Sequence, residues 1–438
     1  MAPAASTVAT PAAQPVPYGR LLRARLPLYV RFLIMLVLAV GAAGLLGTEA
    51  ARGGRIVLLA VLLRRLLRCF CGLPSRRCTA FGGRALEPTM PGLHRRVLEL
   101  YGGAEGAAEA GLASSEDTLD RMQKRIKLAD GQEIAYWDIG SIKSESVVLL
   151  CNGLGARLAG WAPLLDALHG ESSGWSRRRL VVPEYRGQFS SVPLKGSGVS
   201  VETSAKDISE LAKALGLKRV CILCWSTGVQ VGLQLALERP DLVQAMVLIQ
   251  GTTGQALSCI MQPLCPVPLM PGFLTWFLGC APAFFVAGGR RAALHGLLVR
   301  HSSAFECIAR CLVWVFGSDF MPPIVVRYAQ DMLQSDNHFT QYCAYAEALG
   351  RHVLAPRLPE IKAPAFVVTG TPDFVTPARC SYDLSASLGG PVKLLDDVSG
   401  SHYYIFEEPH KLATAIVAFL DETSPVTSED PQLFTGRR

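Results

Sequence analysis

Residues 220–229 read VCILCWSTGV, and this stretch decides the fold that the sequence predicts. Its apolar beginning is typical of a buried strand, and the residues after the serine have the spacing of a helix. A serine between a strand and a helix lies on a sharp turn that exposes its hydroxyl near the positive helix end. Gly228 fits such a tight turn, whereas Cys224 occupies the first glycine position of the pattern G-x-S-x-G. The alternative interpretation of Ser226 is a residue that only caps the helix.

Strand-like and helix-like runs alternate on both sides of this turn. This alternation predicts an α/β fold with a mostly parallel sheet that helices cover on both faces. The stretch from 251 to about 360 is too long for one crossover between strands, so we expect an inserted helical cap there. We expect the strands near residues 125–128, 133–139, 147–151, 180–183, 219–224, 245–249, 365–369 and 392–395.

The later strand ends supply the acid and the base that a serine nucleophile requires, in the order Ser, Asp, His. Asp373 lies in a turn after the strand-like run 365–369, and His402 lies in a loop after the run 392–395. In an open α/β sheet these carboxyl ends converge on one crevice. Asp396 and Asp397 are rival acids, but they precede the histidine too closely to come from a separate strand end. We therefore predict Asp373 as the acid.

Two backbone N–H groups are candidates for stabilising the oxyanion that forms during attack. Thr227 offers one because it follows the nucleophile, and Leu154 offers the other from the segment CNGLG at 151–155. The same segment resembles the start of a dinucleotide-binding fingerprint, yet Leu158 stands where the third glycine would be. The sequence therefore predicts an oxyanion hole and no organic cofactor.

Taken together, these motifs make residues from about 121 to 421 similar to the α/β-hydrolase fold superfamily, in its serine esterase and lipase type with a cap insertion. Further resemblance lies in PEYRGQFS at 183–190, which is similar to the family loop D-x-R-G-x-G-x-S, in LERPDLV at 237–243 and in FEEP at 406–409. The resemblance implies a nucleophile, a base, an orienting acid and two oxyanion donors, namely Ser226, His402, Asp373, Leu154 and Thr227. The sequence departs from the family pattern at Cys224, Asn152 and Phe189.

The N-terminal part carries the positive charge of the chain. Residues 1–86 contain twelve arginines, no lysine and one acid, so this part has a formal charge of +11 and the remainder has −4 out of +7. A nucleic-acid enzyme would carry basic residues on its working domain, so we predict no nucleic-acid partner. The odd number of cysteines, 13, and their place in apolar runs favour a reducing compartment and no metal site.

An apolar run at residues 28–48 predicts a single transmembrane helix, with Arg31 near enough to its edge to reach the headgroups. Slightly more basic residues follow the run than precede it, which favours a hydrolase domain on the cytosolic side. The alternative is a removed transit peptide of a plastid or mitochondrion. The predicted division is a basic Ala/Pro-rich arm (1–27), the transmembrane helix (28–48), a basic interfacial segment and linker (49–120), the hydrolase domain (121–422) and a polar tail (423–438).

The cap sequence bears on the substrate. Residues 257–287 are rich in large apolar side chains, contain no charge and are interrupted by prolines. This stretch is either the core of the cap, an apolar funnel for an acyl chain, or a surface that dips into a membrane. The sequence thus predicts a membrane-associated serine hydrolase that cleaves a lipophilic carboxylic ester through an acyl-enzyme. The alternatives are an acyltransferase or thioesterase with the same triad, or a catalytically silent protein that binds a lipid or a partner.

Overall fold

The structure, a computed structural model, describes residues 119–426 except 172–174, 195–196, 261–269, 316–323 and 398–399. The predicted arm, transmembrane helix and interfacial segment lie outside the described residues, as do the linker up to residue 118 and the tail from residue 427.

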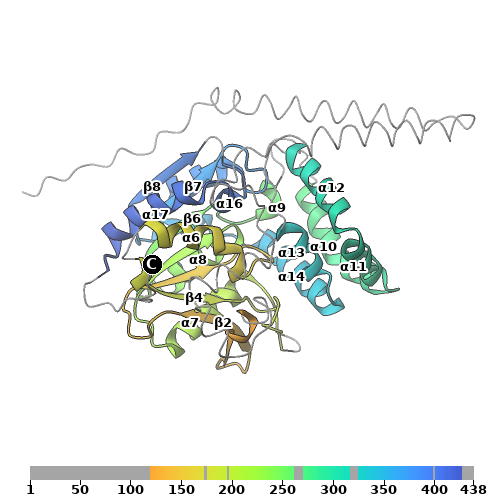
Figure 1. Ribbon diagram of the computed structural model, residues 1–438, viewed down its shortest axis with the longest axis horizontal. Coiled ribbons are helices and arrows are strands. Elements are labelled where there is room, and N and C mark those ends of the chain that lie inside the picture. The colour runs from red at the N-terminus through yellow and green to blue at the C-terminus, as the bar shows by residue number, and fades with distance from the viewer. Residues whose placement is uncertain are drawn as a thin grey trace, which may run out of the picture.

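An eight-stranded sheet forms the centre of the described part, in the order β1-β2-β4-β3-β5-β6-β7-β8 (Figure 1). β2 runs antiparallel to both of its neighbours, and β3 to β8 are mutually parallel. The mostly parallel sheet is therefore confirmed, and the carboxyl ends of β3 to β8 open at one edge. The strands are β1 (Lys124–Lys127), β2 (Glu133–Ile139), β3 (Val147–Cys151), β4 (Arg179–Pro183), β5 (Val220–Trp225), β6 (Val243–Ile249), β7 (Ala365–Gly370) and β8 (Val392–Asp397).

Helices cover both faces of the sheet, as the sequence predicted. One apolar core lies under α6 (Ala162–Glu171), α16 (Tyr404–Glu407) and α17 (Pro409–Thr423). The other lies under α7 (Val201–Ala214), α8 (Thr227–Glu238) and α15 (Ala378–Ser387). β5 is buried on both sides, so its sequence is a continuous apolar run. Cys221 and Cys224 belong to different cores, because alternate residues of a strand face opposite sides.

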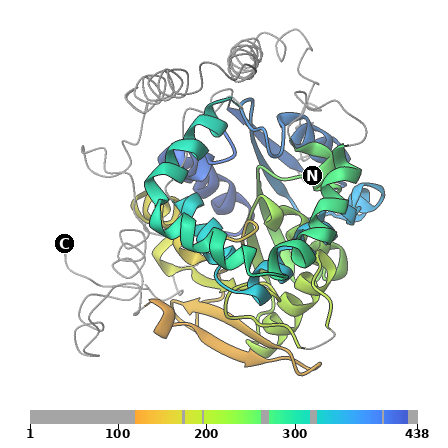
Figure 2. The same cartoon turned by 90° about the vertical axis from the view of Figure 1, so that its right-hand side faces the viewer.

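The helices between β6 and β7 form a separate layer beside the carboxyl edge of the sheet, and we call residues 256–351 the cap. Figure 2 shows these helices, coloured green to cyan, in front of the sheet. They contain a small core of their own around Ala281, Phe339 and Cys343. The cap helices are α9 (Ala256–Cys259), α10 (Met270–Val286), α11 (Arg290–Arg300), α12 (Ser302–Val315), α13 (Ile324–Met332) and α14 (Asp336–Arg351).

Three short 3₁₀ helices complete the described elements: η2 (Leu158–Trp161), η3 (Trp175–Arg177) and η4 (Ala355–Glu360). Among the described residues, no single helix has the length and apolar character needed to cross a bilayer. By length and composition alone, the bent pair of Pro271–Val286 and Arg290–Arg300, with 89° between them, meets that requirement.

Candidate active site

Ser226 occupies a strained turn between β5 and α8. Its backbone has φ 55° and ψ −117°, a conformation that residues other than glycine rarely adopt. The turn brings α8 so close to the end of β3 that a Cβ atom at Gly228 would overlap the carbonyl oxygen of Cys151. Glycine is therefore required at position 228, and the strained turn raises the serine hydroxyl above the sheet edge.

The structure explains why a cysteine can replace the first glycine of the motif. The side chain of Cys224 points toward α8, where it meets Gly232. A Cβ atom at Gly232 would overlap the Sγ atom of Cys224 and would lie 2.9 Å from Cδ1 of Ile222. The missing side chain at position 232 thus provides the space that the Cys224 side chain fills. The glycine in the helix therefore compensates for the larger residue in the strand.

The structure brings the three side chains predicted for catalysis together. Nε2 of His402 lies 2.9 Å from Oγ of Ser226, and Nδ1 of His402 lies 2.9 Å from Oδ2 of Asp373. The carboxylate accepts a hydrogen bond from the Nδ1–H group, which leaves Nε2 as the acceptor for the serine hydroxyl. The arrangement can therefore remove a proton from Ser226 when it attacks a carbonyl carbon.

Asp373 is held in place by the loop that follows β7. Its Oδ1 accepts hydrogen bonds from the backbone N–H groups of Val375 at 2.9 Å and Thr376 at 2.8 Å. The hydroxyl of Thr376 lies 2.9 Å from Oδ2 of Asp373 and 2.7 Å from the carbonyl oxygen of Gln250. The carboxylate thus has hydrogen-bond donors on both oxygens while one oxygen faces the histidine, which fixes the orientation of the ring.

Two residues that the sequence analysis missed support the loop of His402. Nε1 of Trp225 donates to the carbonyl oxygen of His402 at 3.2 Å, and Nε2 of Gln250 donates to the carbonyl oxygen of Ser401. Gln250 has φ 50°, so its backbone turns sharply at the end of β6. The sequence signal was available, because Gln250 and Trp225 directly follow or end strands whose carboxyl ends meet at this edge.

The two predicted oxyanion donors, Leu154 and Thr227, both line the cavity beside Ser226. Thr227 begins α8, so its N–H has no partner within the helix. The turn that carries Leu154 is fixed by Asn152, which donates to the carbonyl oxygen of Pro183 at 2.8 Å and accepts from Nε1 of Trp161 at 2.8 Å. Asn152, where the family pattern has histidine, thus anchors this turn to the strand beside it.

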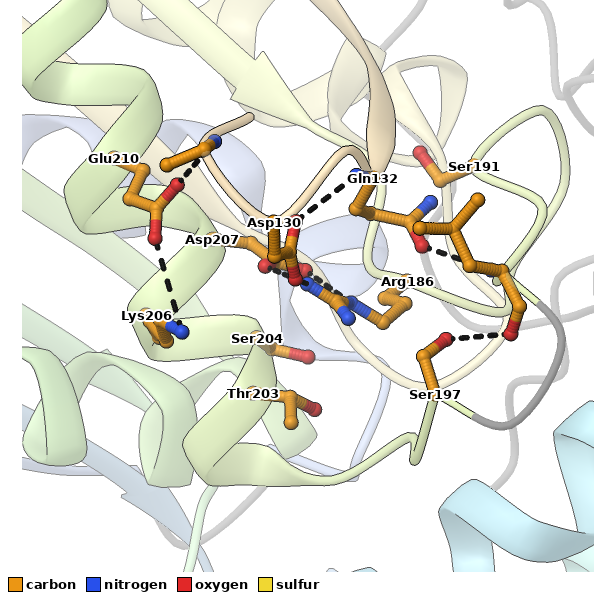
Figure 3. Close-up of polar contacts among 12 residues, drawn as sticks. Asp130, Gln132, Arg186, Ser191, Ser197, Thr203, Ser204, Lys206, Asp207 and Glu210 are labelled. Atoms are coloured by element: carbon orange, nitrogen blue, oxygen red, sulfur yellow. Dashed lines mark hydrogen bonds and ion pairs between the residues drawn. The ribbon is translucent and has the colours of Figure 1, made fainter. Parts of the chain in front are cut away.

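The loop at 184–191 packs beside this turn and is anchored by a buried ion pair. Arg186 donates to both carboxylate oxygens of Asp207, at 2.9 and 2.5 Å, and to Oδ2 of Asp130 at 2.7 Å. Figure 3 shows the Arg186 guanidinium between these two carboxylates, which come from α7 and from the β1–β2 turn. Arg186 and Asp207 are both buried. Because Arg186 contacts both Asp207 and Asp130, it joins three segments that are far apart in sequence.

Phe189 replaces the second glycine of the family loop and keeps a glycine-like backbone, with φ 44°. The guanidinium of Arg157 lies 4.9 Å from the centre of its ring, and Nε2 of His338 in α14 lies 3.2 Å from its carbonyl oxygen. Contacts from the core and the cap therefore hold a conformation that a phenylalanine rarely adopts.

A cavity of about 550 Å³ opens onto Ser226 and His402. The cap supplies most of the apolar wall of this cavity. Tyr342 of the cap also lines it, and burial raises the pKa of this tyrosine to about 12, so its side chain stays neutral. Cap residues that line the cavity include Leu274, Phe277, Leu278, Val325, Met332 and Leu349. The nucleophile and the base therefore lie at one end of a mostly apolar cavity.

The rival acid Asp397 does not face His402; its Oδ2 accepts from Tyr404 and from Lys411, each at 2.6 Å. Asp396 accepts from the hydroxyl of Tyr382 at 2.8 Å. Within the residues that the structure describes, no three side chains of histidine, cysteine, aspartate or glutamate lie close enough to hold a metal ion together.

Comparison with known proteins places this chain in a family. The profile of the alpha/beta hydrolase fold matches residues 146–409. A 2-hydroxy-6-oxononadienedioate/2-hydroxy-6-oxononatrienedioate hydrolase of Paraburkholderia xenovorans is 24% identical over 306 residues, which is 68% of this chain and 93% of that protein. A Caulobacter vibrioides protein named as a carbamate hydrolase, RutD, is 34% identical over 112 residues, which is 26% of this chain and only 39% of that protein.

Among solved structures, the esterase EaEST from Exiguobacterium antarcticum superposes with a TM-score of 0.52 at 19% identity. The match covers 68% of this chain and all of that chain. The profile match spans more than half of the sequence, and the shared fold agrees with the mostly parallel, helix-covered sheet described above. This protein belongs to the alpha/beta hydrolase fold family.

Proposed function

We propose that this protein is a serine hydrolase that cleaves a lipophilic carboxylic ester through an acyl-enzyme intermediate. The observation that carries the proposal is the hydrogen-bonded chain Ser226, His402 and Asp373, with 2.9 Å at each step, at the floor of an apolar cavity. A nucleophile, a base and an orienting acid in contact are the components that acyl transfer requires.

In this mechanism His402 accepts the hydroxyl proton as Ser226 Oγ attacks the ester carbonyl. The oxyanion that forms would receive hydrogen bonds from the backbone N–H groups of Leu154 and Thr227. His402 then donates its proton to the leaving alcohol, which leaves an ester between the acyl group and Ser226. Water, deprotonated by His402, attacks that ester, and the acid leaves while the proton returns to Ser226.

The cap supports a lipophilic substrate at a lipid surface. The aromatic face of α10, which we define as Phe273, Trp276, Phe277 and Phe284, is exposed to solvent, and Trp276 is 62% exposed. Phe277 and its neighbour Leu274 on the same helix also line the cavity. One helix thus connects the exposed aromatic face to the cavity wall, an arrangement that would let an ester pass from a bilayer to Ser226.

Charge at this face is consistent with lipid headgroups. Arg290 follows α10, and its guanidinium lies 4.6 Å from the centre of the Phe284 ring. A cation beside exposed aromatic rings is typical of segments that lie in the interfacial region of a membrane. We therefore propose that the aromatic face contacts the membrane, and that the predicted transmembrane helix at 28–48 would keep it there.

A fluorophosphonate probe tests the proposed reaction, because it labels only an activated serine. We expect membranes with the wild-type chain to be labelled and to hydrolyse 4-nitrophenyl octanoate, and the Ser226→Ala variant to do neither. Ser387→Ala changes a serine at the end of α15, which does not line the cavity, and serves as the control that keeps labelling. Absence of labelling in a folded wild-type protein would contradict the proposal and favour a silent protein that binds a lipid.

A further inference from the structure

One polar side chain in the cavity wall has no role in the triad. Gln230 lies on α8, four residues after Ser226, and lines the cavity although it is only 1% exposed. In the described part of the chain, its Nε2 atom has no hydrogen-bond partner. The side chains around it in the cavity wall are mostly apolar, among them Ala256, Leu257 and Leu349. A buried carboxamide in such a place needs a partner.

The other end of the Gln230 carboxamide is held by a buried histidine. Oε1 of Gln230 lies 2.8 Å from Nδ1 of His352, and Nε2 of that ring lies 3.1 Å from Oε1 of Gln234. Nε2 of Gln234 donates to Glu238 at 2.6 Å, so Gln234 can offer only its oxygen to the ring. His352 therefore carries a proton on Nε2 and meets Gln230 through Nδ1.

This arrangement leaves one polar atom of the Gln230 carboxamide without a partner in the described part of the protein, in either charge state of the ring. A protonated ring donates from Nδ1 to Oε1 of Gln230, and Nε2 of the carboxamide stays free, as in the structure. With a neutral ring Nδ1 is an acceptor, so the carboxamide turns over, Nε2 donates to it and Oε1 becomes free. A hydroxyl group satisfies both arrangements because it donates and accepts.

We propose that Gln230 is a specificity-determining residue that binds a hydroxyl group on the otherwise apolar chain of the ester. The proposal rests on the proposed ester hydrolysis and narrows its substrate class to hydroxylated lipophilic esters. Four residues of helix rise about 6 Å, so the hydroxyl would lie on the order of four to six bonds from the scissile carbonyl. A plain alkyl chain would leave the buried carboxamide unpaired, and the site would discriminate against it.

Two substrate series locate the hydroxyl. One consists of 4-nitrophenyl octanoates with a hydroxyl at successive chain positions, and the other of octanediol monoacetates, which place the hydroxyl on the alcohol side. We expect the wild-type kcat/KM for the best-placed hydroxyl ester in one series to exceed that of its unsubstituted counterpart by about tenfold. Gln230→Met should abolish this ratio while it keeps or increases the hydrolysis of the plain ester.

Leu349→Met is the matched control, because it puts the same side chain into the same cavity wall without removing a polar group. We expect this variant to keep the wild-type ratio, and thermal unfolding of each variant reports whether the contact with His352 merely stabilises the fold. A ratio that survives in Gln230→Met, or no preference in either series, would overturn the inference. Loss of probe labelling and of plain-ester hydrolysis in the wild type would instead refute the proposed function.

Discussion

The core and the cap of this protein differ in how they treat large apolar side chains. In the core, apolar residues fill both sides of the sheet, and the triad residues Asp373 and His402 are buried with them. In contrast, most of the large apolar residues that are exposed in the described structure belong to the cap, on helices α10 to α12. The core thus holds the groups of the proposed reaction, whereas the cap forms the apolar surfaces that a substrate would meet first.

The two regions also meet the cavity differently. The core contributes the strained turn that carries the nucleophile and the polar groups around it. The cap contributes apolar walls from helices whose other faces are open to solvent. Substitutions in the core should therefore change catalysis and stability, and those on the exposed cap face should change only delivery of the substrate.

The largest expected effect concerns the acid of the core. Asp373→Asn keeps the shape of the side chain but removes the charge that orients and stabilises the protonated His402, so kcat should fall about ten-thousand-fold. Steady-state rates of 4-nitrophenol release from 4-nitrophenyl octanoate measure this loss of kcat. Asp396→Asn is the matched control at the end of the neighbouring strand, and it should retain nearly full activity. Equal losses in the two variants would show that Asp373 has no special role.

The next effect concerns packing between β5 and α8. Gly232→Ala should destabilise the protein by about 1–3 kcal/mol, because the added methyl group overlaps Cys224. Cys224→Ala removes the sulfur atom, so the double variant should recover part of the loss, with a coupling energy of about 1 kcal/mol or more. Urea unfolding of the four proteins gives this value. Strictly additive effects would mean that the two residues do not compensate each other.

A smaller effect is expected on the exposed face of the cap. Trp276→Ser should weaken binding to phosphatidylglycerol-containing vesicles about tenfold, because one large aromatic side chain no longer enters the lipid. Its free energy of unfolding should stay within about 0.5 kcal/mol of the wild-type value. Its rate of hydrolysis of a soluble acetate ester should equal that of the wild type. Ile142→Ser is the control, because Ile142 is an exposed apolar residue outside the cap, and this variant should bind vesicles like the wild type. Equal binding by all three proteins would remove the distinction between the faces.

The smallest effect lies where the cap joins the core, at His352. Burial lowers the pKa of His352 from 6.5, and the Glu202 carboxylate 3.8 Å from Nε2 offsets part of this shift. Since the unfolded chain binds this proton more readily, the stabilisation is complete above about pH 6.5 and declines as the pH falls below it. Urea unfolding across this range should show a shallower decline in His352→Gln. Identical slopes for the two proteins would contradict this assignment.

Much of the core could be predicted from the sequence because its signals are local. Each signal is a short stretch of sequence. These stretches are the strand runs, the serine between strand and helix, and the polar residues that follow β7 and β8. The alternation of strands and helices then fixes which ends converge. The cap was predicted as a helical insertion, but its apolar stretch was left with three interpretations, since helical periodicity does not say which face meets a partner.

The sequence by itself determined the parallel sheet, the turn at Ser226 and the candidates Asp373 and His402, because chain connectivity and residue type dictate them. Only the tertiary structure decided that Gly232 makes space for Cys224, that Thr376 and Gln250 hold the acid and the histidine loop, and that Gln230 lines the cavity. These contacts join residues from different elements. Their geometry depends on close packing between surfaces, which no local pattern of residues encodes.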